Sequence, residues 1–92
     1  MGTTGTASRY SVKADVVARS VAEEMILLDL ETGLYFTLNP VGCAIWRGLE
    51  SNSDRAAIIA GVVEQFEVDE ATATADFDEY IDALTGEGLL VP

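Results

Sequence analysis

The sequence predicts an α+β domain in which a three-stranded antiparallel sheet is followed by three helices. Two patterns lead to this prediction. Residues 25–38 contain two runs rich in branched and aromatic side chains with a short turn between them, which is typical of a β-hairpin. From residue 40 onward, apolar side chains instead recur every three or four positions, which is typical of amphipathic helices. With 92 residues in total, we expect one small domain over residues 9–92.

The N-terminal part is predicted to contain an arm and a first strand. Residues 1–8 are small and polar, so we expect a disordered arm there. Apolar and polar side chains alternate over residues 9–14, which predicts a strand. Residues 15–20 are interpreted as a connection that is partly extended at its two valines. The sheet is therefore expected to contain residues 9–14 and the two strands of the hairpin.

The hairpin consists of two predicted strands, residues 25–30 and 34–38. The turn between them contains Gly33, which can adopt a positive φ without steric cost. Directly after the second strand, Asn39 is expected to cap a helix and Pro40 to occupy its first turn, where a missing N–H group costs nothing. If the second strand lies at an edge of the sheet, its unpaired backbone groups can accept an extended peptide.

The first two helices follow the hairpin directly. The first is predicted over residues 40–49, with Trp46 beside its apolar stripe as a core or interface anchor. We expect Ser53 to cap the second helix. Gly61 lies inside this second helix, where glycine costs roughly 1 kcal/mol relative to alanine. Close packing of another element against Gly61 is the expected explanation.

The third helix is predicted to be acidic. Asp69 is its expected cap and Gly86 its expected end, and the apolar residues 89–91 are expected to fold back onto the core. Residues 56–92 contain nine acidic side chains and no Lys or Arg. Such a surface favours a basic partner, although a solvated acidic surface that only keeps the protein in solution is an equally good interpretation.

The charge of the chain argues against nucleic acid as a partner. Sixteen acidic residues face five basic ones, which gives a net charge of −11 that repels a phosphate backbone. Three short helices beside a small sheet also resemble a winged helix-turn-helix. The recognition helix of that fold normally carries Lys or Arg, and the third helix here has neither.

The residues that catalysis or metal binding would require are largely missing. The chain contains no histidine, so the usual general base and the commonest metal ligand are absent. Cys43 is the only cysteine and is interpreted as a small packing residue. Neither an Asp-rich calcium loop nor a Gly-rich phosphate loop is present. We therefore predict no catalytic residue, no metal site and no cofactor.

The sequence also bears on the compartment. We find no charged N-terminal region followed by an apolar run, as a signal peptide would have, and no apolar run long enough for a bilayer. A single cysteine fits a reducing environment. These features lead us to expect a cytoplasmic protein without a membrane partner.

An ordered series of short segments resembles the PqqD-like family, the small leader-recognition domains of ribosomally made, modified peptides. The segments are Leu27-Leu-Asp-Leu-Glu-Thr-Gly-Leu-Tyr-Phe-Thr-Leu-Asn39, Ile45-Trp46 with Leu49, Phe66-Glu-Val-Asp69, Leu84, and Gly88-Leu-Leu90. The resemblance covers roughly residues 21–91. Overall likeness favours the stand-alone, lasso-peptide type over the pyrroloquinoline quinone type.

The resemblance implies that a leader peptide adds as a strand to the third strand and lies between that strand and the third helix. Carried onto this chain, the edge is formed by Leu34, Tyr35, Phe36, Thr37 and Leu38. The opposite wall would be formed by Asp76, Tyr80 and Ala83, with Phe77 and Leu84 beneath them. For Phe36, Leu38, Phe77 and Leu84, a purely structural role in the core is the commoner alternative.

The resemblance further implies the partners. A lasso-type leader would carry a Tyr and a Pro a few residues apart, together with basic residues that meet the acidic helix. A cysteine protease that removes the leader and a cyclase would then act on the bound precursor. The alternatives are a PqqD-type peptide chaperone for a radical SAM enzyme, a winged-helix regulatory protein, and a small enzyme, which the missing histidine disfavours.

Overall fold

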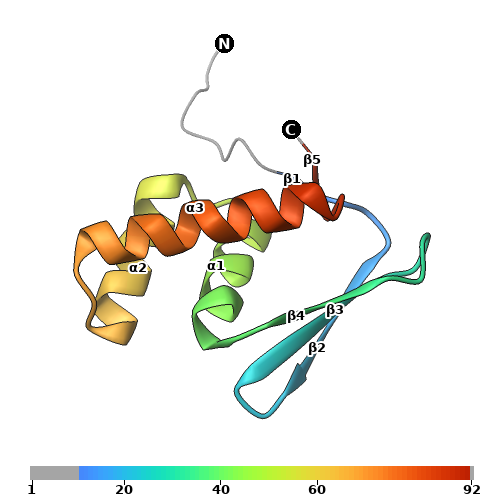
Figure 1. Cartoon of the computed structure of the whole chain (residues 1–92), viewed down its shortest axis with the longest axis horizontal. Coiled ribbons are helices and arrows are strands. Elements are labelled where there is room, and N and C mark those ends of the chain that lie inside the picture. The colour runs from blue at the N-terminus through green and yellow to red at the C-terminus, as the bar shows by residue number, and fades with distance from the viewer. Residues whose placement is uncertain (1–10, 92) are drawn as a thin grey trace.

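The computed structural model describes residues 11–91, and it has the predicted α+β architecture (Figure 1). A three-stranded antiparallel sheet is followed by three helices, and a short two-stranded ribbon is added to them. The predicted arm at residues 1–8 lies outside the described residues. The elements are β1 (Ser11–Val12), β2 (Val16–Val21), β3 (Glu24–Asp29), β4 (Tyr35–Leu38), α1 (Pro40–Glu50), α2 (Arg55–Phe66), α3 (Glu70–Gly86) and β5 (Leu90–Val91).

The sheet has the strand order β2-β3-β4, so its first strand is not the one that the sequence predicts. Residues 16–21 form β2, whereas residues 11–12 form β1, which pairs with β5 in the separate ribbon. The strand predicted at 9–14 is present at residues 11–12 as β1, but its placement in the three-stranded sheet was wrong. The strand that takes its place, β2, was missed because it lacks the expected alternation: five of its six residues are exposed. Its turn into β3 uses Ala22 at a φ of 57°, so no glycine marks the hairpin.

The core lies between the inner face of the sheet and the three helices. In β3 and β4, alternate side chains face inward, as the period of two requires, and they are buried except for the half-buried Phe36. The α1 stripe packs against them with Ile45, Trp46 and Leu49, each at most 1% exposed. From the C-terminal end, Leu89 and Leu90 fold back and are 3% exposed, which confirms the predicted apolar tail.

Two of the three helices are capped by the predicted residue, and the cap of the other lies one residue further along the chain. The side chain of Asn39 accepts a hydrogen bond of 2.8 Å from the Gly42 N–H and caps α1, as predicted. Asp69 likewise caps α3. The second helix, however, is capped by Asp54 and not by Ser53. The backbone N–H of Ser53 instead donates to the carbonyl oxygen of Gly48, so Ser53 closes the turn that follows α1.

Close approach occurs at two glycines other than the one predicted. A Cβ atom on Gly61 would meet nothing within 4 Å, so the expected packing there is wrong. On Gly48, a Cβ would lie 2.6 Å from Cγ1 of Ile58, which brings α1 and α2 close together. On Gly42, it would lie 2.8 Å from the ring of Tyr80, which brings α1 and α3 together.

Candidate peptide-binding groove

The outer edge of β4 has no strand partner among the described residues. β4 pairs only with β3, in the register that places Phe36 opposite Leu27. Leu34 directly precedes β4, and its carbonyl oxygen accepts a 2.9 Å hydrogen bond from the N–H of Asp29. Because residues of an antiparallel strand turn their N–H and C=O groups alternately to either side, Phe36 also bonds toward β3.

The same alternation directs the N–H and C=O groups of Tyr35 and Thr37 outward, toward the free edge. Side chains alternate too, but between the two faces of the sheet. Phe36 and Leu38 face the core, whereas Tyr35 is 73% exposed and Thr37 is exposed. The edge therefore offers unpaired backbone groups at two residues whose side chains lie on the outer face.

The C-terminal part of α3 and the residues after it flank this edge at both ends. Near the start of β4, a shallow depression is lined by Asp29, Leu34, Tyr35, Phe36, Glu87 and Leu89. Near its end, the Tyr80 ring packs on Gly42, where a Cβ atom would lie 2.8 Å from the ring. We call the strip between β4 and these α3 residues the β4–α3 groove.

The predicted wall residues fall into two groups. Asp76, Tyr80 and Ala83 are partly exposed, so a bound peptide can reach their side chains. Phe77 and Leu84 are completely buried and support the helix from below. The first group thus lies at the surface and the second beneath it, and contact of either group with a peptide stays a prediction.

Two charged residues in the groove were missed from the sequence. Glu87 follows α3 and lines the depression together with Phe36. Asp29 was overlooked because it lies within a strand pattern of apolar residues, where a lone carboxylate is itself a signal. Its side chain is 2% exposed.

Asp29 holds the turn that leads into β4. Its carboxylate accepts hydrogen bonds from Nζ of Lys13 at 2.8 Å and from the N–H of Glu31 at 2.9 Å. The Lys13 hydrogen bond lowers the pKa of Asp29, with a smaller contribution from the backbone N–H groups of the turn, while burial opposes them. The pKa of Lys13 is correspondingly raised by Asp29 and Glu31. The start of β4 is thus fixed to the segment after β1.

Tyr80 is the titratable side chain with the clearest environment in the groove. Partial burial raises the pKa of its hydroxyl, and the hydrogen bond from the Asn39 N–H acts in the opposite direction because it favours the phenolate. Because the ring lies directly against Gly42, it forms a wall at the α1 end of the groove.

The outer face of the sheet is the second notable surface. Pairing places Val17, Leu28 and Tyr35 in one row across the three strands, and all three are exposed. Val21 and Leu30 add exposed fractions of 53% and 59% at either end of the face. Exposed apolar side chains that adjoin one another in this way commonly mark an interaction site.

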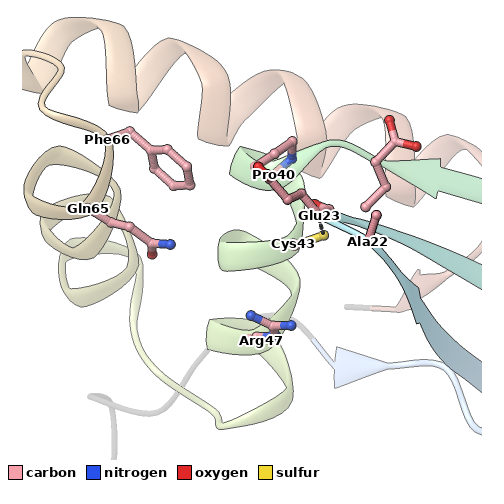
Figure 2. Close-up of a pocket in the computed structure, with 8 residues that line it drawn as sticks. Ala22, Glu23, Pro40, Cys43, Arg47, Gln65 and Phe66 are labelled. Atoms are coloured by element: carbon pink, nitrogen blue, oxygen red, sulfur yellow. Dashed lines mark hydrogen bonds between the residues drawn. The ribbon is translucent and has the colours of Figure 1, made fainter.

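A larger cavity, of about 260 Å³, lies elsewhere (Figure 2). Pro40, Cys43 and Arg47 lie along one side of α1 and face Gln65 and Phe66 of α2. No residue of β4 or α3 lines it.

Cys43, on the wall of this cavity, is buried, and burial raises the pKa of its thiol. Its Sγ lies 3.8 Å from the carbonyl oxygens of Glu23 and Leu38. These contacts confirm the prediction of a packing residue.

Over residues 11–91, no three His, Cys, Asp or Glu side chains are grouped so that they could hold a metal ion. No helix in that part of the chain is both long and apolar enough to cross a membrane.

The comparisons with known proteins agree with this geometry. A family model described as coenzyme PQQ synthesis protein D (PqqD) matches residues 24–90, from the start of β3 to β5. The chain belongs to the PqqD family. As a PqqD-family domain it is a non-catalytic binding module. The match begins after β2, so the family pattern resides in the β3–β4 hairpin and the helices.

Two solved structures resemble this PqqD-family chain. One is described as TbiB1 in complex with the TbiA(beta) leader peptide; it is 32% identical, has a TM-score of 0.80, and the alignment covers 87% of this chain and 93% of that one. The other is described as lasso peptide synthetase B1 complexed with the leader peptide; it is 21% identical, has a TM-score of 0.82, and the alignment covers 92% and 100%. The second supports the fold only. No curated protein gave a significant match.

Proposed function

We propose that this chain binds the leader of a ribosomally made precursor peptide as an added strand on β4. The observation that carries the proposal is the free edge at Tyr35 and Thr37, flanked by α3. Main-chain hydrogen bonds to these two residues would supply affinity, and side chains in the β4–α3 groove would supply specificity. The leader complex described for the 32% identical structure supports the same ligand class.

The charge of the groove favours a basic leader. Asp76 and Glu79 lie on α3, Glu87 follows it, and α3 itself contains no Lys or Arg. Asp78 is already paired with Arg55 at 3.1 Å. Lys or Arg residues of a leader would therefore meet carboxylates that lack a nearby cation on the same helix.

We further propose that the precursor is of the lasso type and that the bound leader is delivered to a leader peptidase and then a cyclase in the cytoplasm. Delivery requires a surface for the enzyme, and the exposed row Val17, Leu28 and Tyr35 is suited to it because it ends at the β4 edge. Binding there would hold the leader at high effective concentration beside the protease.

A second candidate is peptide delivery to a radical SAM enzyme of pyrroloquinoline quinone synthesis. The observation in its favour is the description of the matching family model. Both candidates use the same groove and differ in the leader that fits it. A winged-helix regulatory role is disfavoured by the acidic α3.

Titration calorimetry with synthetic leaders tests these proposals. We expect a synthetic lasso-precursor leader to bind, and a scrambled peptide of the same composition to bind at least tenfold more weakly, which corresponds to about 1.4 kcal/mol. Equal binding of both peptides would mean that the chain recognises only the charge of the peptide and not its sequence. Tighter binding of a pyrroloquinoline quinone precursor leader would favour the second candidate, and salt-dependent binding of random duplex DNA would favour the regulatory one.

A further inference from the structure

The outer edge of β2 is a second row of backbone groups without a strand partner among the described residues. Just before β2, the N–H of Leu30 donates a 2.9 Å hydrogen bond to the carbonyl oxygen of Asp15, so Asp15 bonds toward β3. Because the direction of bonding alternates along an antiparallel strand, every second residue of β2 bonds toward β3 and the others bond outward. The residues whose N–H and C=O groups point outward are Val16, Ala18 and Ser20.

The sequence of β2 contains none of the features that usually protect a free edge. It has no proline and no lysine, and it pairs with β3 without a bulge over all six residues. Five of the six are exposed, and the helices pack mainly on β3 and β4, so β2 forms the margin of the sheet that faces away from the helices (Figure 1). The exposed side chains of Ala18 and Ser20 are also small. A second strand can therefore approach the whole edge.

Charge distinguishes β2 from the other free edge of the sheet. The β4 edge adjoins the carboxylates of Asp76 and Glu87, so two copies that met there would bring like charges together. β2 contains no acidic residue, and its one charged side chain is that of Arg19. In a chain with a net charge of −11, β2 is therefore the edge that is better suited to a second copy of the same chain.

We propose that the β2 strands of two copies pair antiparallel about a two-fold axis at Ala18, so that the two sheets join into one. In this register Ala18 lies opposite Ala18 of the second copy, and Val16 lies opposite Ser20 of the second copy. Each of these pairs exchanges two hydrogen bonds, because the residues involved are those with outward backbone groups. The contact is isologous and closed, and it leaves both β4 edges free at the two ends of the joined sheet. The dimer does not depend on leader binding.

The same register brings opposite charges together. Arg19 lies opposite Val17 of the second copy, so the two Arg19 side chains do not face each other directly. One step along the diagonal on the same face is Asp15 of the second copy, and diagonal neighbours are within reach of a long side chain. Neither Arg19 nor Asp15 forms an ion pair with a described residue of its own chain. The two-fold axis makes this ion pair twice in each dimer.

Sedimentation velocity of the purified chain from about 1 μM to about 1 mM tests the dimer. A single pair of strands makes a small interface, so we expect monomer and dimer to exchange with concentration. Ala18→Pro removes the N–H at the axis and breaks no bond to β3, and it should raise the dissociation constant about tenfold or more. Ala18→Ser keeps the N–H and is the matched control. A wild type that is monomeric throughout, or an Ala18→Pro that dimerises like the wild type, would overturn the proposal.

A double-mutant cycle tests the register. Asp15 has a φ of 66°, which asparagine tolerates, so Asp15→Asn removes the charge and keeps the backbone. We expect Asp15→Asn and Arg19→Gln each to weaken the dimer about threefold or more, and the double variant to be no weaker than either. Glu64→Gln removes the same charge from an exposed position on α2 and should not weaken the dimer. If net charge alone governed association, Asp15→Asn would instead strengthen the dimer. That result, or additive losses in the double variant, would refute the register.

Amide hydrogen exchange of the wild type locates the contact without any substitution. As the protein concentration rises, the outward N–H groups of β2 should become protected, while those of Tyr35 and Thr37 on β4 should not. Protection that appears at Tyr35 and Thr37 and not on β2 would place the contact between copies on β4 and overturn the proposal.

Discussion

Replacing Thr37 by proline should remove leader binding while leaving the domain folded. The Thr37 N–H points to the free edge, so proline there breaks no hydrogen bond to β3. The preceding residue, Phe36, is already extended, which is the conformation that a following proline requires. What disappears is one donor to the guest, and the pyrrolidine ring occupies the space in which the guest backbone would lie.

The magnitude follows from these two effects. One lost backbone hydrogen bond is worth about 0.5–1.5 kcal/mol, and the ring also hinders the neighbouring bond. We therefore expect the dissociation constant for a fluorescently labelled leader to rise about tenfold or more, which corresponds to about 1.4 kcal/mol. Fluorescence anisotropy measures this change, and the midpoint of urea unfolding reports whether the fold is kept.

Two controls make the result decisive. Thr37→Val retains the N–H and the β-branched shape and should bind like the wild type. Ala18→Pro places the same change on the other free edge, where the Ala18 N–H also points outward, and should leave leader binding unchanged. If Thr37→Pro folds and binds the leader with wild-type affinity, strand addition at β4 is refuted.

Three other changes test the groove and its support. Tyr80→Ala, or charge reversal in Asp76→Lys, should weaken leader binding by about 1 kcal/mol or more without unfolding the domain, as measured by calorimetry; unchanged affinity in both would place the groove elsewhere. Phe77→Ala should lower the free energy of unfolding by about 3–5 kcal/mol in urea titrations, because the side chain is completely buried; a loss below 1 kcal/mol would contradict that packing. The folded-state pKa of Asp29 is lowered, so its stabilising contribution is present above the unfolded value of 3.8 and is lost as the pH falls through the folded pKa. The difference in the free energy of unfolding between the wild type and Asp29→Asn should therefore shrink with acidification over that window. A constant difference would show that the ionised Asp29 carboxylate does not stabilise the fold.

The parts of the fold that sequence predicted correctly are encoded locally. Gly33 at a φ of 78°, the Asn39 cap and the Asp69 cap each depend on residues that are close together in the chain. The same holds for β3 and β4, where buried and exposed side chains alternate.

The parts that the sequence did not predict depend on distant contacts or on their absence. β2 is exposed over most of its length, so its sequence has no alternation of apolar and polar residues from which a strand could be predicted. β1 pairs with β5 from the other end of the chain, and no local pattern indicates such pairing. Within the groove, the approach of Tyr80 to Asn39 and Gly42 joins α3 to the start of α1, and Glu87 reaches β4 only through the path of α3.

The β1–β5 ribbon has a consequence for protein engineering. Ser11 pairs with Val91, so the two ends of the described chain lie side by side. A short linker between them would close the chain into a ring, and new ends could then be opened at the exposed residues 51–52 between α1 and α2. In such a circular permutant α2, α3 and β5 would precede the linker and the elements from β1 to α1 would follow it, so neither α3 nor the β3–β4 hairpin would be cut. The groove could then be joined to another protein through a different point of attachment.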